Sequence, residues 1–341
     1  MNELFRGEQL VCCHDRDTGL RAVIAVDDTR LGPAVGGVRM KAYPGELAAI
    51  TEAQRLAAGM TLKNAAAGLP FGGGKSVILA DDALRPQDRA QVLRAFGRFV
   101  ARLGGSYIPG VDMGTSVADL AVVGTVAPRV ACAESDPSPW TALGVHAGIR
   151  AAIAHLGGRD LHGVRVAIQG AGHVGAELAR LLAVDGAHVI VADVDPARAR
   201  LVAARIGGEA VAAGRIMGVE CDVFAPCAVA KVVDTTTAGS LGCRVLAGAA
   251  NDQLADRRTA TALAEAGVLN VPDFLINSGG VVQIYASMQG WDDDRLRPEV
   301  LAIGDRVAAV LDSARHDNVS PLEAAEALAH RRLTESQAIP A

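Results

Sequence analysis

The chain has 341 residues, half of them apolar and only 3% aromatic, and a formal net charge of −5. This length allows two domains, and without a basic excess nucleic acid is not expected as a partner. No apolar run reaches membrane-spanning length, and the N-terminal MNELFRGEQL lacks the apolar core of a signal peptide.

In the first third of the chain, strands alternate with helices, which predicts an α/β domain. Two strands are expected at residues 8–15 and 21–28, joined by a turn at 17–19. They are followed by a helix at 46–60, a strand at 76–80, a helix near 86–103 and a short strand at 105–109. The next helix should be capped by Ser116.

A stretch rich in serine and proline, residues 134–140, marks a domain boundary. A helix at 141–156, a second strand–helix alternation to about 290, and amphipathic helices near 295–316 and 320–332 follow. We therefore expect a two-domain α/β fold with a cleft between the domains. Residues 1–132, with C-terminal helices from about 316–341, form the substrate and oligomerisation domain, and 133–315 form a Rossmann domain.

The segment GLPFGGGKSVILA, residues 68–80, is not a P-loop. A P-loop would need glycine where Leu69 stands, and it would follow a strand and open a helix. Here the expected helix comes first and the strand second. Lys75 is therefore predicted on a flexible loop at the entrance of the strand.

Lysine is rare in this chain: of 33 basic residues four are lysine, which leaves 29 arginines. Arginine stays protonated, whereas lysine loses its proton when its surroundings lower its pKa. Lys63 and Lys75 lie twelve residues apart around the glycine-rich segment and are candidates for such a role. The alternative is that the four lysines occur at their positions by chance and have no special role. This alternative stays open for Lys41 and Lys231. Asp112 is a third candidate. Taken alone, it could equally stabilise a turn, but the presence of both lysines favours a functional role.

The segment from Gly170 to Gly175 fits the dinucleotide fingerprint G-x-G-x-x-G. An apolar strand precedes it, a helix follows, and a second strand ends at Asp193, where a carboxylate can bind ribose hydroxyls and repel a 2′-phosphate. This favours NAD over NADP. The alternative is a glycine-rich turn that binds nothing. His173, inside the fingerprint, is expected to be a packing or solvent residue rather than a catalyst.

These motifs occur in an order that resembles the amino acid dehydrogenase family of leucine, valine, phenylalanine and glutamate dehydrogenases, in its leucine/valine/phenylalanine branch. The resemblance covers nearly the whole chain. It includes GMTLKNAAAG, GGGKS, PGVDMGTS, LGPAVGGVRM, CDVFAPCA, VLAGAAN and INSGGVV. It implies NAD-dependent, reversible oxidative deamination of an L-amino acid to a 2-oxo acid, ammonia and NADH, by a homo-oligomer.

The resemblance also implies residue roles. Lys75 would be the general base and Asp112 would exchange protons with the amine, with Lys63 binding the substrate carboxylate and lowering the pKa of Lys75. The remaining implied substrate residues are Gly37, Val35, Gly110, Val281, Ile284, Asn251 and Asp252. The implied cofactor residues are Gly170, Gly172, His173, Val174, Gly175, Asp193, Thr141, Cys227, Ala228, Ala249, Asn251 and Asn277.

Three departures from the family pattern affect these expectations. Asp252 stands where asparagine is usual, Ser278 stands where alanine is common, and the segment 130–140 is shorter and less rich in glycine. Gly110 occupies a position where aliphatic-specific members tend to have alanine. A missing methyl group deepens a pocket, so phenylalanine-like substrates are expected first and leucine-like substrates second.

Six cysteines (Cys12, Cys13, Cys132, Cys221, Cys227 and Cys243) show no CxxC spacing. Neither a metal site nor a disulfide framework is expected, which favours reduced thiols and the cytoplasm. Two other functions remain open. One is a different NAD enzyme, for instance one acting on hydroxy acids with a histidine base. The other is a catalytically silent homologue, for which Asp252 is the main argument.

Overall fold

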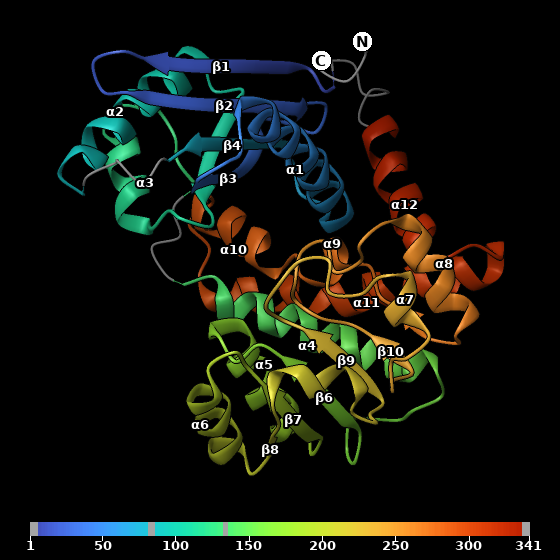
Figure 1. The fold of residues 1–341 in the computed structure, drawn as a ribbon. Helices are drawn as coiled ribbons and strands as arrows, with labels where there is room; N and C mark the ends of the chain where they lie inside the picture. Colours follow the sequence, from blue (N-terminus) through green and yellow to red (C-terminus); the bar gives the residue numbers. More distant parts are fainter. Residues whose placement is uncertain (1–5, 81–85, 132–135, 336–341) are drawn as a thin grey trace. The chain divides into compact units, whose positions relative to one another are not determined.

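The computed structural model describes residues 6–80, 86–131 and 136–335 (Figure 1). The chain divides into two compact units, Met1–Ser135 with Ala329–Ala341, and Asp136–Leu328. Each unit is built around one sheet covered by helices, so the predicted two-domain α/β fold is confirmed. Cys132 and the predicted boundary at 132/133 lie outside the described residues.

The first unit contains a five-stranded sheet in the order β1-β2-β4-β3-β5. Strands β3, β4 and β5 run parallel, and β2 pairs antiparallel with both β1 and β4. Its elements are β1 (Gln9–Asp15), β2 (Leu20–Asp28), β3 (Ala34–Lys41), α1 (Glu46–Ala67), β4 (Gly72–Leu79), α2 (Pro86–Arg102), β5 (Tyr107–Val111) and α3 (Val117–Gly124).

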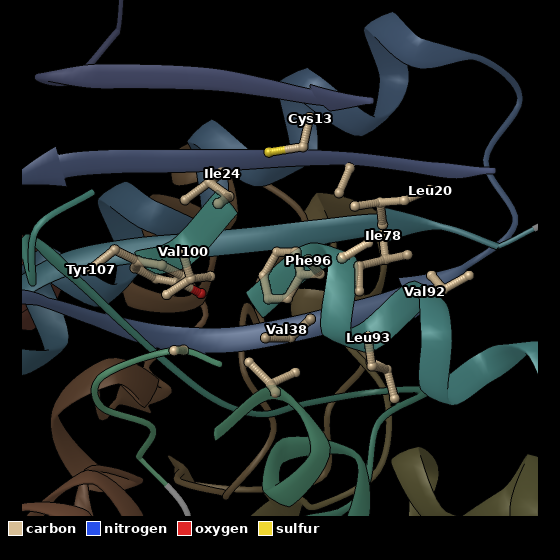
Figure 2. Packing of buried hydrophobic residues seen from close by; sticks show 14 of the residues in the cluster. Cys13, Leu20, Ile24, Val38, Ile78, Val92, Leu93, Phe96, Val100 and Tyr107 are labelled. Carbon is tan, nitrogen blue, oxygen red and sulfur yellow. The ribbon is translucent and has the colours of Figure 1, made fainter. Parts of the chain in front are cut away.

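The two faces of this sheet bury different side chains. On one face, Ile78 and Val38 pack with Phe96 of α2 and with α3 residues in the larger core (Figure 2). On the other face, Val77 packs against the alanines of α1. Small alanines let the helix approach the strands closely, and this second face carries the candidate catalytic residues.

Two expectations for this unit are corrected. Helix α1 continues to Ala67, so Lys63 lies on the helix, which ends at Gly68 in a left-handed conformation (φ 76°). The chain from Gly72 onward is already strand β4, so Lys75 lies inside a buried strand and not on a flexible loop. Strand β3 was not predicted, because its adjacent glycines at 36 and 37 weaken the strand signal.

The glycines of β4 are required by close approach rather than by flexibility. A Cβ on Gly72 would lie 1.8 Å from the carbonyl oxygen of Asp28, and one on Gly73 would lie 2.1 Å from Oγ1 of Thr61 on α1. Glycine therefore lets α1 and the neighbouring chain lie directly on the strand.

The second unit contains a six-stranded, fully parallel sheet in the order β11-β10-β9-β6-β7-β8. Its elements are α4 (Ser138–His155), β6 (Arg165–Gln169), α5 (His173–Val184), β7 (His188–Ala192), α6 (Pro196–Ile206), β8 (Glu209–Ala210), η1 (Ala213–Gly218), β9 (Val223–Pro226), α7 (Thr235–Ala238), β10 (Val245–Leu246), α8 (Arg257–Glu265), β11 (Leu269–Asn270), α9 (Asp273–Ile276), α10 (Gly279–Met288), α11 (Asp293–Asp317) and α12 (Pro321–Glu335). The last turns of α12, from Ala329, belong to the first unit.

Strand β6 lies between β7 and β9, so the chain leaves the sheet in opposite directions on either side of it. In doubly wound sheets, ligands bind at the carboxyl end of the strands at such a switch point. The glycine-rich turn at 170–172 follows β6 directly and so occupies this position.

Candidate active site

The candidate catalytic residues of the first unit share one face of its sheet. Gly37 of β3 is opposite Gly110 of β5, and Val38 is opposite both Ser76 and Val111. Since side chains alternate along a strand, Lys75 and Asp112 point to the same face as Gly37. Helix α1 covers this face.

Lys75 and Asp112 form a buried ion pair. The Nζ atom of Lys75 lies 2.9 Å from Oδ2 of Asp112, and Lys75 is only 6% exposed. Burial lowers the pKa of Lys75, and the charge of Asp112 opposes this effect without cancelling it. The structure therefore brings together the two predicted catalytic residues and gives the lysine the shift that a base requires.

Asp112 is held as an anion. Burial alone would raise its pKa, but the charges and hydrogen bonds of Lys75 and Arg39 bring it down to about 2. Its backbone is fixed as well, because Thr115 Oγ1 accepts a hydrogen bond from the Asp112 amide at 3.0 Å. Ser116 then caps α3 immediately after this turn, as predicted, and it does so in a capping box with Asp119.

Arg39 and Glu52 are functional candidates that the sequence analysis missed. Arg39 donates from Nε to Oδ2 of Asp112 at 2.9 Å and from a terminal nitrogen to Glu52 at 2.7 Å. Arg39 is thus a cation that lowers the pKa of Lys75, a contribution that was not predicted. The signal was the alternation of Gly37, Arg39 and Lys41 along one face of a strand.

The remaining predicted substrate residues of this unit lie on the same elements. Lys63 is half-buried in the last turns of α1, and Val35, Gly37 and Gly110 lie on β3 and β5. A Cβ on Gly37 would lie 3.1 Å from Nζ of Lys75, so this glycine opens the space next to the ion pair. A Cβ on Gly110 would lie 3.3 Å from the carbonyl oxygen of Ala131. A small shift of the neighbouring chain would relieve this close contact.

In the second unit, the fingerprint glycines form a tight strand–helix turn. Gly170 has a φ of 105°, which glycine adopts readily, and Gly172 is the N-cap of α5. A Cβ on Gly175 would lie 1.9 Å from the carbonyl oxygen of Gly170, so the helix packs directly on the turn. Cys227 and Ala228, which follow β9, pack against Gly170.

Gly172 provides a test of whether a dinucleotide fits this turn. Apart from its own chain neighbours, no described residue has a heavy atom within 4 Å of the position that a Cβ on Gly172 would take. The free amides at the start of α5 and the open space beside them match the needs of a diphosphate. The donor set and the shape of the turn therefore fit a dinucleotide.

Asp193 has a structural role that the sequence did not indicate. One carboxylate oxygen accepts the amide of Ala171 at 2.7 Å, and the other accepts the amide of Asp195 at 2.8 Å. Burial opposes ionisation, but these two bonds keep the pKa of Asp193 below its usual range. The carboxylate thus ties the end of β7 to the glycine-rich turn.

His173 is mostly exposed and begins α5, where Val174 follows it. Its Nδ1 lies 3.0 Å from Oδ2 of Asp136. This agrees with a solvent residue and not with a buried base.

The other predicted residues of this unit gather around α9 and α10. The side-chain amide of Asn277 donates from Nδ2 to the carbonyl of Ala249 and to Oδ1 of Asn251, each at 3.1 Å. Val281 and Ile284 are half-buried one turn apart on α10. Thr141 of α4 lies against Gly280 and donates to the carbonyl of Pro137 at 3.2 Å.

Asp252 has a left-handed backbone (φ 51°), and its amide donates to Oδ2 of Asp273 at 2.5 Å. Asparagine and aspartate are the non-glycine residues that best tolerate this conformation. The backbone at position 252 therefore explains why aspartate can replace the asparagine that is usual there.

Among the residues that the structure describes, no helix is long and apolar enough to span a membrane, and no group of three or more histidine, cysteine or acidic residues could hold a metal ion.

Two family models match the chain. "Glu/Leu/Phe/Val dehydrogenase, dimerisation domain" matches residues 8–126. "Glutamate/Leucine/Phenylalanine/Valine dehydrogenase" matches residues 136–197 and 197–338. The resemblance predicted from the motifs is thereby confirmed.

Individual relatives match over nearly the full length. Leucine dehydrogenase of Thermoactinomyces intermedius is 40% identical over 97% of this chain and 92% of its own. Valine dehydrogenase of Streptomyces albus is 40% identical over 97% and 93%. The crystal structure of L-tryptophan dehydrogenase from Nostoc punctiforme has a TM-score of 0.86 at 37% identity, over 97% of each chain.

Proposed function

The chain belongs to the Glu/Leu/Phe/Val dehydrogenase family, and we propose that it catalyses the NAD-dependent, reversible oxidative deamination of an apolar L-amino acid. The products are the 2-oxo acid, ammonia and NADH. One observation carries this proposal beyond family membership: the buried Lys75–Asp112 ion pair, with the pKa of Lys75 lowered, on the face of the sheet under α1.

The first unit is proposed to hold the amino acid. Lys63 binds its carboxylate, and the anionic Asp112 accepts hydrogen bonds from its amine. Once neutral, Lys75 takes a proton from the water that adds to the iminium carbon, and it can return that proton as ammonia leaves. Both steps need a base that is neutral for part of the time near neutral pH, which agrees with the buried position of Lys75.

The second unit is proposed to hold NAD through the turn from Gly170 to Gly175 and through Asp193. NAD bound there would supply the hydride acceptor that oxidation of the α-carbon requires. Asp193 remains charged, and a 2′-phosphate beside it would be repelled. Arg198 lies 3.6 Å from Asp193 and is already engaged with that carboxylate, which further supports NAD over NADP.

The substrate is proposed to be apolar, with a phenylalanine-like side chain first and a leucine-like side chain second. In the first unit, Val35 and Gly110 offer only apolar or backbone surface to a side chain. In the second unit, taken by itself, Val281 and Ile284 of α10 are also apolar. Leucine, valine and tryptophan dehydrogenases among the relatives agree with an apolar class. A homo-oligomer is proposed because the matching N-terminal family model is a dimerisation domain.

The test follows NADH formation with a panel of L-amino acids and 2-hydroxy acids, in wild type and Lys75→Ala. We expect a signal with apolar L-amino acids in wild type and a loss of several orders of magnitude in the variant. A signal only with hydroxy acids would identify another type of dehydrogenase. Binding of NADH without turnover of any amino acid, in either direction, would identify a silent homologue.

A further inference from the structure

Two cations share one oxygen atom of Asp112. Arg39 Nε and Lys75 Nζ each lie 2.9 Å from Oδ2. Among the described residues, no side chain bonds Oδ1. One oxygen is thus committed to holding the two cations together, and the other is left for a further hydrogen-bond donor.

Arg39 is itself held from the opposite side. Its terminal nitrogen bonds Oε1 of Glu52 at 2.7 Å, and the same oxygen accepts the hydroxyl of Tyr43 at 3.1 Å and lies 3.3 Å from Nζ of Lys41. Arg39 therefore bridges two carboxylates, one on α1 and one after β5, and its side chain is only 16% exposed. A guanidinium bound at both ends has a fixed position.

The charges of this cluster point to one group that can release a proton. Three cations (Lys75, Arg39 and Lys41) face two anions (Asp112 and Glu52), so the loss of one proton makes the cluster neutral. Arginine does not lose its proton in proteins. The side chain of Lys41 is 39% exposed, whereas that of Lys75 is buried.

We infer that Arg39 is a positioning residue for the reaction: bonded to Asp112 and backed by Glu52, it keeps the carboxylate ionised and makes Lys75 the group that gives up its proton. This inference rests on the proposed function, in which neutral Lys75 is the base. Arg39 acts through its neighbours and is not assigned a contact with the substrate.

The inference predicts shifts of opposite sign from two variants. The groups that act on Lys75 are Asp112, which follows β5, Arg39 of β3 and Glu52 of α1. Lys41 and Tyr43 act on the same cluster through Glu52. Burial and the positive charge of Arg39 lower the pKa of Lys75, whereas Asp112 and Glu52 raise it. Removing Arg39 should thus raise the pKa of Lys75, and removing Glu52 should lower it.

The experiment measures the pH profile of kcat/KM for oxidative deamination of an apolar L-amino acid that wild type accepts. Arg39→Met should move the rising limb to higher pH by about one unit or more, the usual effect of a charge at this distance. Below that limb the rate should then fall about tenfold or more. Arg39→Lys, which keeps the charge, should restore much of the profile, and Glu52→Gln should move the limb to lower pH.

Arg98→Met is the matched control, since it removes another arginine–aspartate pair of the same unit, between Arg98 and Asp15. It should leave the limb in place. If wild type and Arg39→Met share one limb, or if Arg39→Met and Glu52→Gln move it in the same direction, the inference is wrong. If wild type turns over no amino acid at all, the proposed function fails first, which distinguishes the two outcomes.

Discussion

Gly37 lies so close to Asp112 that a Cβ on the glycine would be 2.6 Å from the Cβ of the aspartate. Nζ of Lys75 would be 3.1 Å from the same added atom. We expect Gly37→Ala to push Lys75 and Asp112 apart and to lower kcat/KM about 100-fold, the typical cost of displacing catalytic groups by about 1 Å. Steady-state kinetics would measure this loss, and circular dichroism would verify that the variant is folded.

Gly59→Ala is the control for that variant. Gly59 is exposed on α1, and outside its own helical turn no described residue has a heavy atom within 4 Å of the position of its added Cβ. Alanine in place of a helical glycine should stabilise the protein by up to about 1 kcal/mol and leave kcat/KM unchanged. A Gly37→Ala enzyme as active as Gly59→Ala would show that the close approach does not position the ion pair.

Gly172→Ala should weaken dinucleotide binding without harming the fold. Its added Cβ meets no atom of the other described residues within 4 Å beyond its chain neighbours, and its φ of −71° suits alanine. The methyl group would, however, stand where the diphosphate is expected to approach. We expect the Kd for NADH, measured by fluorescence titration, to rise about tenfold, which is roughly 1.4 kcal/mol.

Gly214→Ala, in η1 of the same unit, is the matched substitution, because its Cβ also meets nothing within 4 Å among the described residues that are not its chain neighbours. It should bind NADH like wild type. Equal affinity of Gly172→Ala and Gly214→Ala would place the diphosphate elsewhere.

The sequence predicted the second unit well because its signals are local. A strand, a glycine-rich turn, a helix and an acidic residue stand in one continuous segment, and the structure has β6, α5 and β7 within a few residues of the expected positions. The anchoring of the turn by Asp193 was missed, since its bond to Ala171 joins residues 22 positions apart.

The first unit was harder to predict for a physical reason. In β3 and β4, glycines mark close contacts with neighbouring chain, and from sequence alone they resemble a flexible loop. The partnership of Arg39 with Asp112 spans 73 positions and depends on the pairing of β3 with β5, which no local pattern contains. Lys75 and Asp112 were found through their motifs, whereas Arg39 and Glu52 are visible only in three dimensions.

His146 should make the protein sensitive to acid. It is buried on α4, its Nε2 lies 2.9 Å from Oδ2 of Asp185, and its Nδ1 has no partner among the described residues. Burial lowers the pKa of His146, and Asp185 only partly opposes this. The unfolded chain therefore binds a proton at higher pH than the folded chain does, so stability falls as the pH drops below about 6.5.

Urea unfolding at several pH values above and below that point would measure this loss for wild type and His146→Gln. The variant should lose stability less steeply, by a difference of at most about 1.4 kcal/mol per pH unit for one group. His330→Gln, at an exposed position on α12, should follow the wild-type curve. Identical slopes in wild type and His146→Gln would remove this histidine as the cause.

Gly110→Ala should change which amino acids are accepted. The added methyl group would sit 3.3 Å from the carbonyl oxygen and 3.6 Å from the Cβ of Ala131, so the strand can accept it with small shifts. If Gly110 lines the substrate pocket, the methyl group occupies the space of a bulky side chain. We expect kcat/KM for phenylalanine to fall relative to that for valine by about 10- to 100-fold, since one methylene contributes about 1–3 kcal/mol of discrimination.

The ratio of the two kcat/KM values is the informative quantity, because a general loss of activity lowers both and leaves the ratio unchanged. Gly59→Ala again provides the comparison, since it adds a methyl group to the same unit at an exposed helical position. A ratio that stays at the wild-type value in Gly110→Ala would mean that the side chain of the substrate does not reach β5. The apolar pocket would then have to be sought on other elements.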